Sequence, residues 1–321
     1  MELRYGYFAI ENSQPGSGIM KNASELNYTI HHLCIYDDQP RDNMWPYLRW
    51  HHGITNYFSG AVFHVTGEGH SDYTFLGVGG RAYQIQIEAP PFQFEYERNW
   101  WRDHGHGYNH VCWITSNARA SMDHLLENGA TEVMPFEKFP TYDGFVVHDP
   151  EGRWIEVMEY TDENFRVQEF THAPTGECGL EMIGNAEVCA DVEAMVAWYQ
   201  AVMDLRVLKR YENGDDVVVY LTDKDHDPQT RNTVFILQNA RMDFEKAHMA
   251  KHGPYISAIV YQAIDVQRAY EDALWAGMKE LQPPGIDPLT GALTAYLHEP
   301  CGGNVLMLRE QFAARKNREA S

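Results

Sequence analysis

Basic residues are scarce in this sequence of 321 residues, and long apolar runs are missing from it. Lys and Arg total 25 against 46 Asp and Glu, so the formal net charge is −21 at pH 7. Because a surface this acidic repels phosphate backbones and anionic lipids, we expect no nucleic-acid partner and no membrane partner. No stretch approaches the roughly 18 to 20 apolar residues that span a bilayer, and the first residues lack the basic start and apolar run of a signal peptide. The sequence therefore predicts a cytoplasmic protein.

Cysteines are also few, and their spacing follows no known framework. There are five of them, an odd number, and they are scattered over the chain as Cys34, Cys112, Cys178, Cys189 and Cys301. This distribution excludes a disulfide scaffold and a paired-cysteine zinc site, so we expect free thiols. Hydrophobic residues make up 44% of the chain and aromatic residues 13%, which suffices for two ordinary domains with cores of their own.

A βαβββ pattern repeats along the chain at intervals of roughly 70 to 80 residues. The clearest copy opens with an alternating strand at 109–115 and continues into a helical pattern over 118–129. Three short β-prone runs follow. The last two, at 144–148 and 154–159, are joined by the turn Asp-Pro-Glu-Gly at 149–152. The spacing of these elements predicts one compact module.

The same order of elements recurs in three more copies, which begin near Thr29, Ala186 and Ile256. Four modules make two pairs, and a polar stretch without clear period separates the pairs. We therefore expect an N-terminal arm at 1–26, a paired-module domain at 27–162, a linker at 163–178, a second paired-module domain at 179–312 and a tail at 313–321.

Two motifs carry a family resemblance. The opening Asn-His-Val-Cys-Trp-Ile at 109–114 and the closing Asp-Pro-Glu-Gly-Arg-Trp-Ile-Glu-Val at 149–157, set in repeated βαβββ units, resemble the vicinal oxygen chelate superfamily. That superfamily holds glyoxalase I, extradiol ring-cleaving dioxygenases, epimerases and resistance proteins. The resemblance implies an α+β fold of four βαβββ modules, arranged as two paired-module domains whose mixed sheets form open, cup-like barrels. It says little about the reaction.

The resemblance also implies a metal site in the N-terminal domain. The family's ligands come from the first and last strands of paired modules, which correspond here to His32, His110 and Glu156. Strand parity agrees, because His32 shares one strand face with Cys34, and His110 shares one with Cys112. His31 should point away and would replace His32 only if the register slipped by one residue. Two imidazoles and one carboxylate favour Fe(II), with Mn(II), Zn(II) or Ni(II) as alternatives.

Other positions refine this hypothesis. Gln84 or Glu88, on the last strand of the first module, would add a fourth ligand in the manner of glyoxalase I. In the C-terminal pair the ligand positions are predicted to hold Gly184, Ala258 and Leu306, whose side chains have no donor atom, so no metal is expected there. The ring-cleaving dioxygenases usually carry their metal in the C-terminal pair, so the two halves have exchanged roles here.

Two catalytic residues are predicted beside the metal. The extradiol signature places a Tyr where this chain has Val146, and His148 lies two residues on, hence on the same strand face. An imidazole there could accept a substrate proton and return it. Tyr142 is one of several aromatic residues that flank the motif strands, and we predict that it contributes to an aromatic pocket.

Three classes of function fit these features. The first is an Fe(II)-dependent extradiol-type dioxygenase, acting with dioxygen on a small dihydroxylated aromatic compound. The second is a non-redox metalloenzyme of glyoxalase, lyase or epimerase type, which a fourth ligand would favour. The third is a binding protein that holds a small molecule without turnover. The three-ligand set favours the first, and we expect a homo-oligomer.

Overall fold

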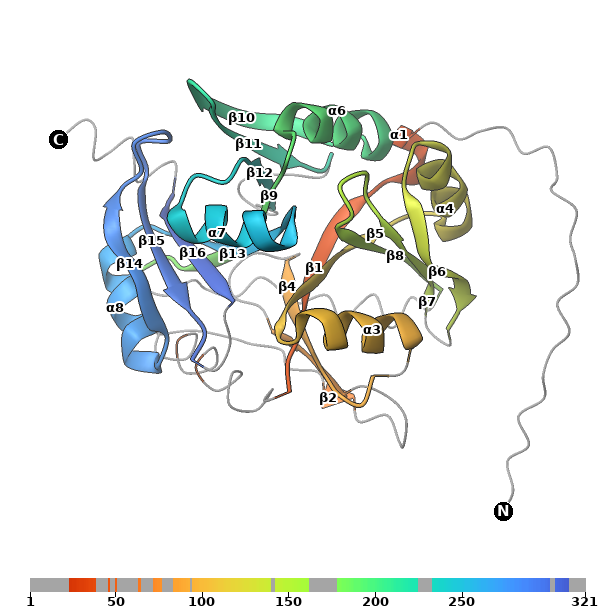
Figure 1. Cartoon of the computed structure of the whole chain (residues 1–321), viewed down its shortest axis with the longest axis horizontal. Helices are drawn as coiled ribbons and strands as arrows, with labels where there is room; N and C mark the ends of the chain where they lie inside the picture. The colour runs from red at the N-terminus through yellow and green to blue at the C-terminus, as the bar shows by residue number, and fades with distance from the viewer. Residues whose placement is uncertain are drawn as a thin grey trace, which may run out of the picture.

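The protein is described here from a computed structural model, which gives the placement of residues 23–38, 46, 50, 63–64, 72–76, 83–92, 94–139, 142–161, 178–224, 233–300 and 304–311. Within these ranges the chain forms two sheets of eight strands each, one after the other along the sequence (Figure 1). Neither sheet closes into a barrel, which confirms the predicted α+β fold of open, mixed sheets. No helix in the described part of the chain is both long and apolar enough to cross a membrane.

The N-terminal sheet has the strand order β2-β3-β4-β1-β5-β8-β7-β6. Its helices are α1 (Ala23–Leu26), α3 (Glu95–His104) and α4 (Ala118–Glu127). Its strands are β1 (Thr29–Tyr36), β2 (Phe63–His64), β3 (Asp72–Leu76), β4 (Gln84–Ala89), β5 (Gly107–Ile114), β6 (Thr131–Lys138), β7 (Tyr142–His148) and β8 (Trp154–Tyr160).

The C-terminal sheet repeats this arrangement in the order β10-β11-β12-β9-β13-β16-β15-β14. Its helices are α6 (Val192–Met203), α7 (Asp243–His252) and α8 (Val266–Ala276). Its strands are β9 (Glu181–Val188), β10 (Arg206–Asn213), β11 (Asp216–Thr222), β12 (Val234–Gln238), β13 (Tyr255–Ala263), β14 (Lys279–Ile286), β15 (Leu293–His298) and β16 (Val305–Glu310).

The topology places the predicted motif strands side by side. In the N-terminal sheet the first strands of the two modules, β1 and β5, are antiparallel neighbours, and each is parallel to the last strand of its own module, β4 or β8. The four central strands of the sheet are therefore those that carry the candidate ligands. The predicted linker at 163–178, apart from Cys178, and the tail at 313–321 lie outside the described residues, so the domain limits stay a prediction.

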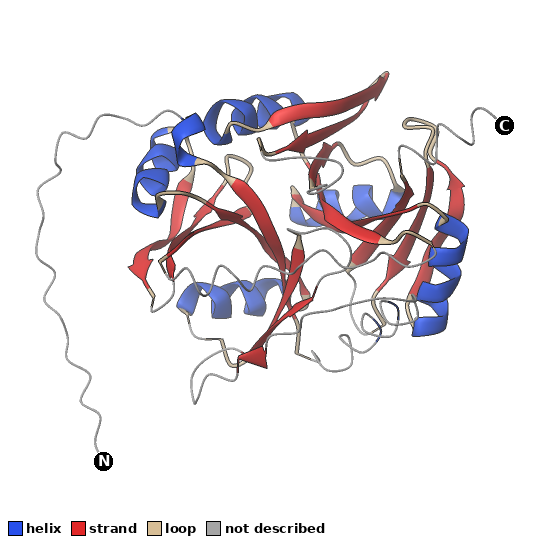
Figure 2. Ribbon diagram, turned by 180° about the vertical axis from the view of Figure 1, so that it is seen from behind, coloured by secondary structure: helices blue, strands red, loops and turns tan. Residues whose placement is uncertain are grey.

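Local signals explain where three of the helices begin. Asn117, Asp191 and Asp265 precede α4, α6 and α8, and each side chain accepts a hydrogen bond from the backbone N–H three residues later. Such caps satisfy amides that a helix leaves unpaired at its start. The three helices lie outside the sheets, while α3 and α7 connect the two modules within each domain (Figure 2).

One apolar core extends across both domains. The ring of Trp113 on β5 lies 5.5 Å from that of Phe235 on β12 and 6.4 Å from that of Tyr199 on α6. Leu33 and Ile35 belong to this core, whereas Cys34 and Tyr36 belong to a separate cluster with Phe92. The alternation along β1 confirms that Cys34 points into the N-terminal cup.

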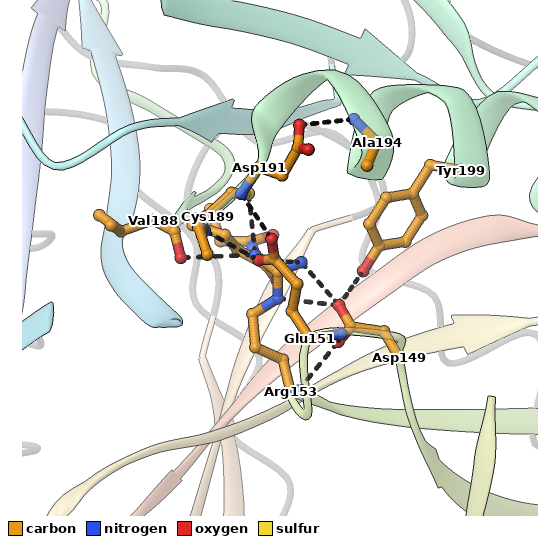
Figure 3. A network of polar contacts seen from close by, with 11 residues as sticks. Asp149, Glu151, Arg153, Val188, Cys189, Asp191, Ala194 and Tyr199 are labelled. Atoms are coloured by element: carbon orange, nitrogen blue, oxygen red, sulfur yellow. Dashed lines mark hydrogen bonds and ion pairs between the residues drawn. The ribbon is translucent and has the colours of Figure 1, made fainter. Parts of the chain in front are cut away.

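The Asp-Pro-Glu-Gly-Arg turn joins the two domains (Figure 3). Its Arg153 guanidinium is 2.7 Å from Asp149 Oδ2 and 3.1 Å from Glu187 Oε2 of β9. Tyr199 of α6 donates to Asp149 at 3.2 Å, and Glu151 accepts from the backbone N–H of Asp191 at 2.8 Å. The turn that carries the family resemblance therefore also fixes the relation between the domains.

Candidate metal centre

The three predicted ligands converge in the N-terminal cup. His32 Nε2 lies 3.5 Å from Glu156 Oε2, and His110 Nε2 lies 3.3 Å from the same oxygen. The two imidazole centroids are 5.8 Å apart. Register explains the convergence, because His32 pairs with Cys112 across β1 and β5, and Cys112 pairs with Glu156 across β5 and β8. Atoms at these separations can ligate one ion, since metal–ligand bonds of about 2.1 Å place neighbouring ligand atoms about 3 Å apart.

The protonation of this site suits a cation. Burial, together with His31 and His110, holds the pKa of His32 well below its usual value, so its imidazole is neutral at pH 7. Burial alone would raise the pKa of Glu156, but its hydrogen bond to His110 and its electrostatic interaction with that side chain lower it. A neutral imidazole and an ionised carboxylate are the forms that bind a metal ion.

His110 is oriented for ligation by its neighbour. Its Nδ1 lies 2.5 Å from Asn109 Oδ1, which can only accept, so the ring proton sits on Nδ1. Its Nε2 is buried and faces Glu156 Oε2 at 3.3 Å. A ligand histidine that donates its other N–H to a fixed acceptor is the usual arrangement in metal sites. The donor set therefore fits a divalent transition metal ion.

His31 does not point away from the site as strand parity predicts. A register shift between Ile30 and His32 in the pairing of β1 with β5 brings both imidazoles together, with their Nδ1 atoms 2.8 Å apart. His31 Nε2 in turn lies 3.0 Å from the hydroxyl of Tyr160. If His32 Nε2 binds a metal, its Nδ1–H donates to His31 Nδ1, and His31 Nε2–H donates to Tyr160. In this arrangement His31 would support His32 through a hydrogen bond, although His31, His32 and Cys112 also lie close enough together to hold an ion.

The fourth-ligand position belongs to Gln86, which the sequence comparison of the modules missed. In the parallel pairing of β1 with β4, Cys34 lies opposite Gln86, just as Cys112 lies opposite Glu156. Gln86 Oε1 is buried without a hydrogen-bond partner in the described residues, while its Nε2 donates to Glu88 Oε1 at 2.7 Å. The two predicted candidates, Gln84 and Glu88, each lie two residues from Gln86 along β4. Alternation along β4 was the available signal, since Gln84, Gln86 and Glu88 share one face.

Additional carboxyl groups surround the centre. Burial and the charges of Glu97 and Glu156 raise the pKa of Glu88 well above its usual value, which favours the protonated form of this side chain. Glu97, buried on α3, accepts a hydrogen bond from the backbone N–H of Phe94 at 2.8 Å. The cup thus holds one ionised ligand carboxylate and a neighbouring carboxyl group that can donate a hydrogen bond.

Aromatic rings line the cup near α3. The ring of Tyr96 lies 5.4 Å from that of Trp154, and Tyr142 stacks on Phe139 at 4.5 Å. Burial and the charges of Glu97, Glu156 and Glu88 raise the pKa of Tyr96, with Tyr142 as a further contributor, so Tyr96 stays neutral. These contacts place Tyr142 in an aromatic cluster beside the start of α3, and its predicted part in the site stays a prediction.

His148 has the predicted strand parity but lies at the end of its strand. Val146 pairs with Glu156, and His148 pairs with Trp154. Its Nδ1 is 3.3 Å from Thr131 Oγ1, and its ring lies 5.8 Å from that of Trp154. His148 lines a cavity between the domains whose wall includes none of the three predicted ligands. Its predicted role as an acid or base therefore stays a prediction.

The C-terminal cup differs at each ligand position. Gly184 lies so close to β12 that a Cβ atom there would be 1.7 Å from the carbonyl oxygen of Val234. The turn at 299–304 is one residue longer than its counterpart, so Met307 pairs with Tyr296 and replaces the predicted Leu306 in the position of Glu156. Leu306 belongs to the main core, whereas Ala258, Tyr296 and Met307 form a second cluster that fills this cup.

Comparisons with known proteins agree with this architecture. Residues 186–308 match the sequence profile of the Glyoxalase/Bleomycin resistance protein/Dioxygenase superfamily. A comparison with curated protein sequences finds no match. Among solved structures, a triple mutant of 4-hydroxymandelate synthase from Streptomyces coelicolor has a TM-score of 0.61 at 12% identity, covering 92% of this chain and 100% of that one.

Two further structures are similar. A Mn(II)-bound glyoxalase from Novosphingobium aromaticivorans has a TM-score of 0.56 at 12% identity, covering 89% of this chain and 82% of that one. The 2,2',3-trihydroxybiphenyl 1,2-dioxygenase of dibenzofuran-degrading Sphingomonas wittichii strain RW1 has a TM-score of 0.54 at 14% identity, covering 88% and 90%. The resemblance to the vicinal oxygen chelate superfamily is confirmed, by the profile in the C-terminal domain and by the fold of the whole chain.

Proposed function

We propose that the N-terminal cup is the active site of a ring-cleaving, extradiol-type dioxygenase that acts on a small dihydroxylated aromatic compound. The observation that carries this proposal is the convergence of His32, His110 and Glu156 within one buried cup. Two histidines and one carboxylate would hold Fe(II). The bound ion would supply open positions for the substrate hydroxyls and for dioxygen. The fold is shared with a trihydroxybiphenyl dioxygenase and with 4-hydroxymandelate synthase, which supports this class.

The chain's own residues would bind the substrate and hold its protons. Trp154 and Tyr96 offer aromatic faces against which a planar ring can pack. The carboxyl group of Glu88, in the protonated form that burial favours, would donate a hydrogen bond to a substrate oxygen near the ligands. Tyr142 extends the aromatic wall, and His148 would accept a phenolic proton if the substrate reaches the end of β7.

The alternative is a non-redox enzyme of glyoxalase, lyase or epimerase type. The observation that favours it is the buried, unpartnered Oε1 of Gln86 in the position equivalent to Glu156. A fourth ligand would leave fewer open positions for both substrate and dioxygen, while still allowing the ion to polarise a carbonyl oxygen. The similar fold of a Mn(II)-bound glyoxalase is consistent with this class.

The metal ligands can be tested by substitution. We expect His110→Ala and Glu156→Ala to abolish stoichiometric metal binding in the N-terminal cup without unfolding the protein, because an open site that loses one of three ligands loses most of its affinity. Metal content would be measured after anaerobic purification and Fe(II) loading, with His124→Gln on α4 as a matched control. If both variants bind metal as the wild type does, the site assignment is wrong.

Oxygen uptake with a panel of catechols and hydroquinones then separates the two functions. Substrate-dependent uptake that disappears in Glu156→Ala supports the dioxygenase. Turnover without oxygen consumption, detected as deuterium exchange into hydroxycarbonyl compounds in D2O, would instead support the non-redox enzyme.

A further inference from the structure

Histidines gather in one cavity between the two domains. The cavity has a volume of about 550 Å³, and its wall includes Trp100, Tyr108, Tyr255 and residues from both sheets. Six of the sixteen histidines of the chain line it, namely His104, His106, His148, His248, His252 and His298. His32, His110 and Glu156 are not part of its wall, although Asn109 and Trp154, which lie beside these ligands, are.

Two helices end at this cavity. α3 and α7 occupy equivalent places in their domains, and both terminate at a glycine, Gly105 or Gly253. Their last residues, His104 and His252, have ring centroids 6.4 Å apart. The C-terminal end of a helix carries a partial negative charge, which attracts cations. Two such ends therefore face one another across the domain boundary with an imidazole on each.

A third histidine, His248, lies beside this pair. His248 precedes His252 by one helical turn, and their ring centroids are 4.7 Å apart. Two imidazoles on one tetrahedral zinc ion have centroids about 5 Å apart, given Zn–N bonds of about 2.0–2.1 Å. The ring centroids of His32 and His110 in the N-terminal cup are 5.8 Å apart. This lies between the centroid separation of His248 and His252, 4.7 Å, and that of His104 and His252, 6.4 Å. The ring nitrogens of the three histidines do not converge as they stand, so binding one ion would require the exposed side chains of His104 and His252 to rotate toward His248.

The hydrogen bonds and charges of these rings suit metal binding. His104 Nδ1 lies 3.0 Å from the carbonyl oxygen of Trp100, so it donates there and leaves Nε2 as the ligand atom. Partial burial and the positive charges of its neighbours His252, Lys251 and His104 lower the pKa of His248 to about 4, so its imidazole is neutral at pH 7. His106, in contrast, is held between Asp37 and Glu299 and is not available as a ligand.

We propose that His104, His248 and His252 form a second metal site, which binds a divalent transition metal ion such as Zn²⁺, Co²⁺ or Ni²⁺ and links the two domains. Imidazole ligands select this group of ions over Mg²⁺ and Ca²⁺. The remaining coordination position opens into the cavity. The site does not depend on the function proposed for the N-terminal cup.

Metal stoichiometry tests this proposal. The full-length protein would be dialysed against Zn²⁺ and its bound zinc counted by mass spectrometry, with Co²⁺ absorption as a second readout of the ligand geometry. We expect two ions per chain in the wild type and one in His252→Ala or His104→Ala, with the affinity of the second site lowered by about 100-fold or more. Lys246→Ala, an exposed change on the same helix, should retain two.

The variants also separate the two metal sites. His110→Ala should retain one ion, and the double variant His110→Ala/His252→Ala should bind none. If zinc binding in His252→Ala equals that of the wild type in number and affinity, the second site does not exist. If only His248→Ala and His252→Ala weaken binding while His104→Ala does not, the link between the domains is refuted. If His252→Ala loses one zinc ion while His110→Ala loses none, the second site is supported and the function proposed for the N-terminal cup is contradicted.

Discussion

At the scale of single residues, the centre depends on how each ligand is held. Asn109 fixes the tautomer of His110 from the preceding position in the chain, whereas His31 contacts His32 because the register of β1 shifts. Both contacts are between sequence neighbours. The second could not be predicted from the sequence, because no residue type marks the shift and regular alternation places His31 on the opposite face.

The support given by His31 can be measured. We expect His31→Ala to weaken metal binding in the N-terminal cup by about 10- to 100-fold, the usual effect of losing a residue that orients a ligand histidine. Competition with a chromophoric chelator would give the dissociation constant, and His110→Ala would serve as the reference for complete loss. Tyr160→Phe should have a smaller effect, since it removes only the outer hydrogen bond. An unchanged dissociation constant in His31→Ala would show that His32 needs no such support.

At the scale of elements, the strands and helices of each module follow from local pattern, while their exact register does not. Caps such as Asp191 and Asp265 mark helix starts, and alternation identifies β1 and β5. The length of each loop then decides which residues of the last strand face the cup. One additional residue before β16 moves Met307 into the position predicted for Leu306, and the position equivalent to Glu156 on β4 belongs to Gln86, between the predicted Gln84 and Glu88.

The contact of β9 with β12 gives a prediction for one element. We expect Gly184→Ala to lower the free energy of unfolding by about 1–3 kcal/mol or more, because the added Cβ would overlap the carbonyl oxygen of Val234 and push the strands apart. Urea denaturation would measure the loss. Gly285→Ala is the matched control, since its nearest neighbour would be 3.9 Å away. Equal stability of the two variants would mean that β12 can move without cost.

At the scale of the whole molecule, the joint between the domains contains more negative than positive charge. The guanidinium of Arg153 forms ion pairs with the carboxylates of Asp149, Glu151 and Glu187. Burial raises the pKa of Glu187 to about 8, with Arg153 opposing the rise and Asp149 and Glu151 adding to it. In the unfolded chain this carboxyl group titrates near its ordinary pKa of about 4.3.

The sign of the pH dependence follows from these two values. Between about pH 4.3 and pH 8 the folded protein holds a proton that the unfolded chain has released, so the stability contributed by Glu187 is present below this range and is lost as the pH rises through it. We expect Glu187→Gln to remove this slope and to be more stable than the wild type above pH 8. Urea unfolding of both proteins from pH 5 to pH 9 would show it. If the free energies of unfolding of the two proteins differ by the same amount at every pH in that range, Glu187 does not hold the extra proton in the folded state.

The close approach of Gly184 to Val234 also bears on how a duplicated protein changes. The two domains are built on one plan, so either cup could in principle carry a site. The superfamily's sequence profile matches the C-terminal domain, whose cup is filled by apolar side chains. A histidine at position 184 would collide with the neighbouring strand before it could bind anything. Regaining the lost site would thus require the strand to move first, a step that no single substitution of a ligand accomplishes. The close packing of β9 against β12 therefore makes it difficult for a ligand side chain to return to the C-terminal cup.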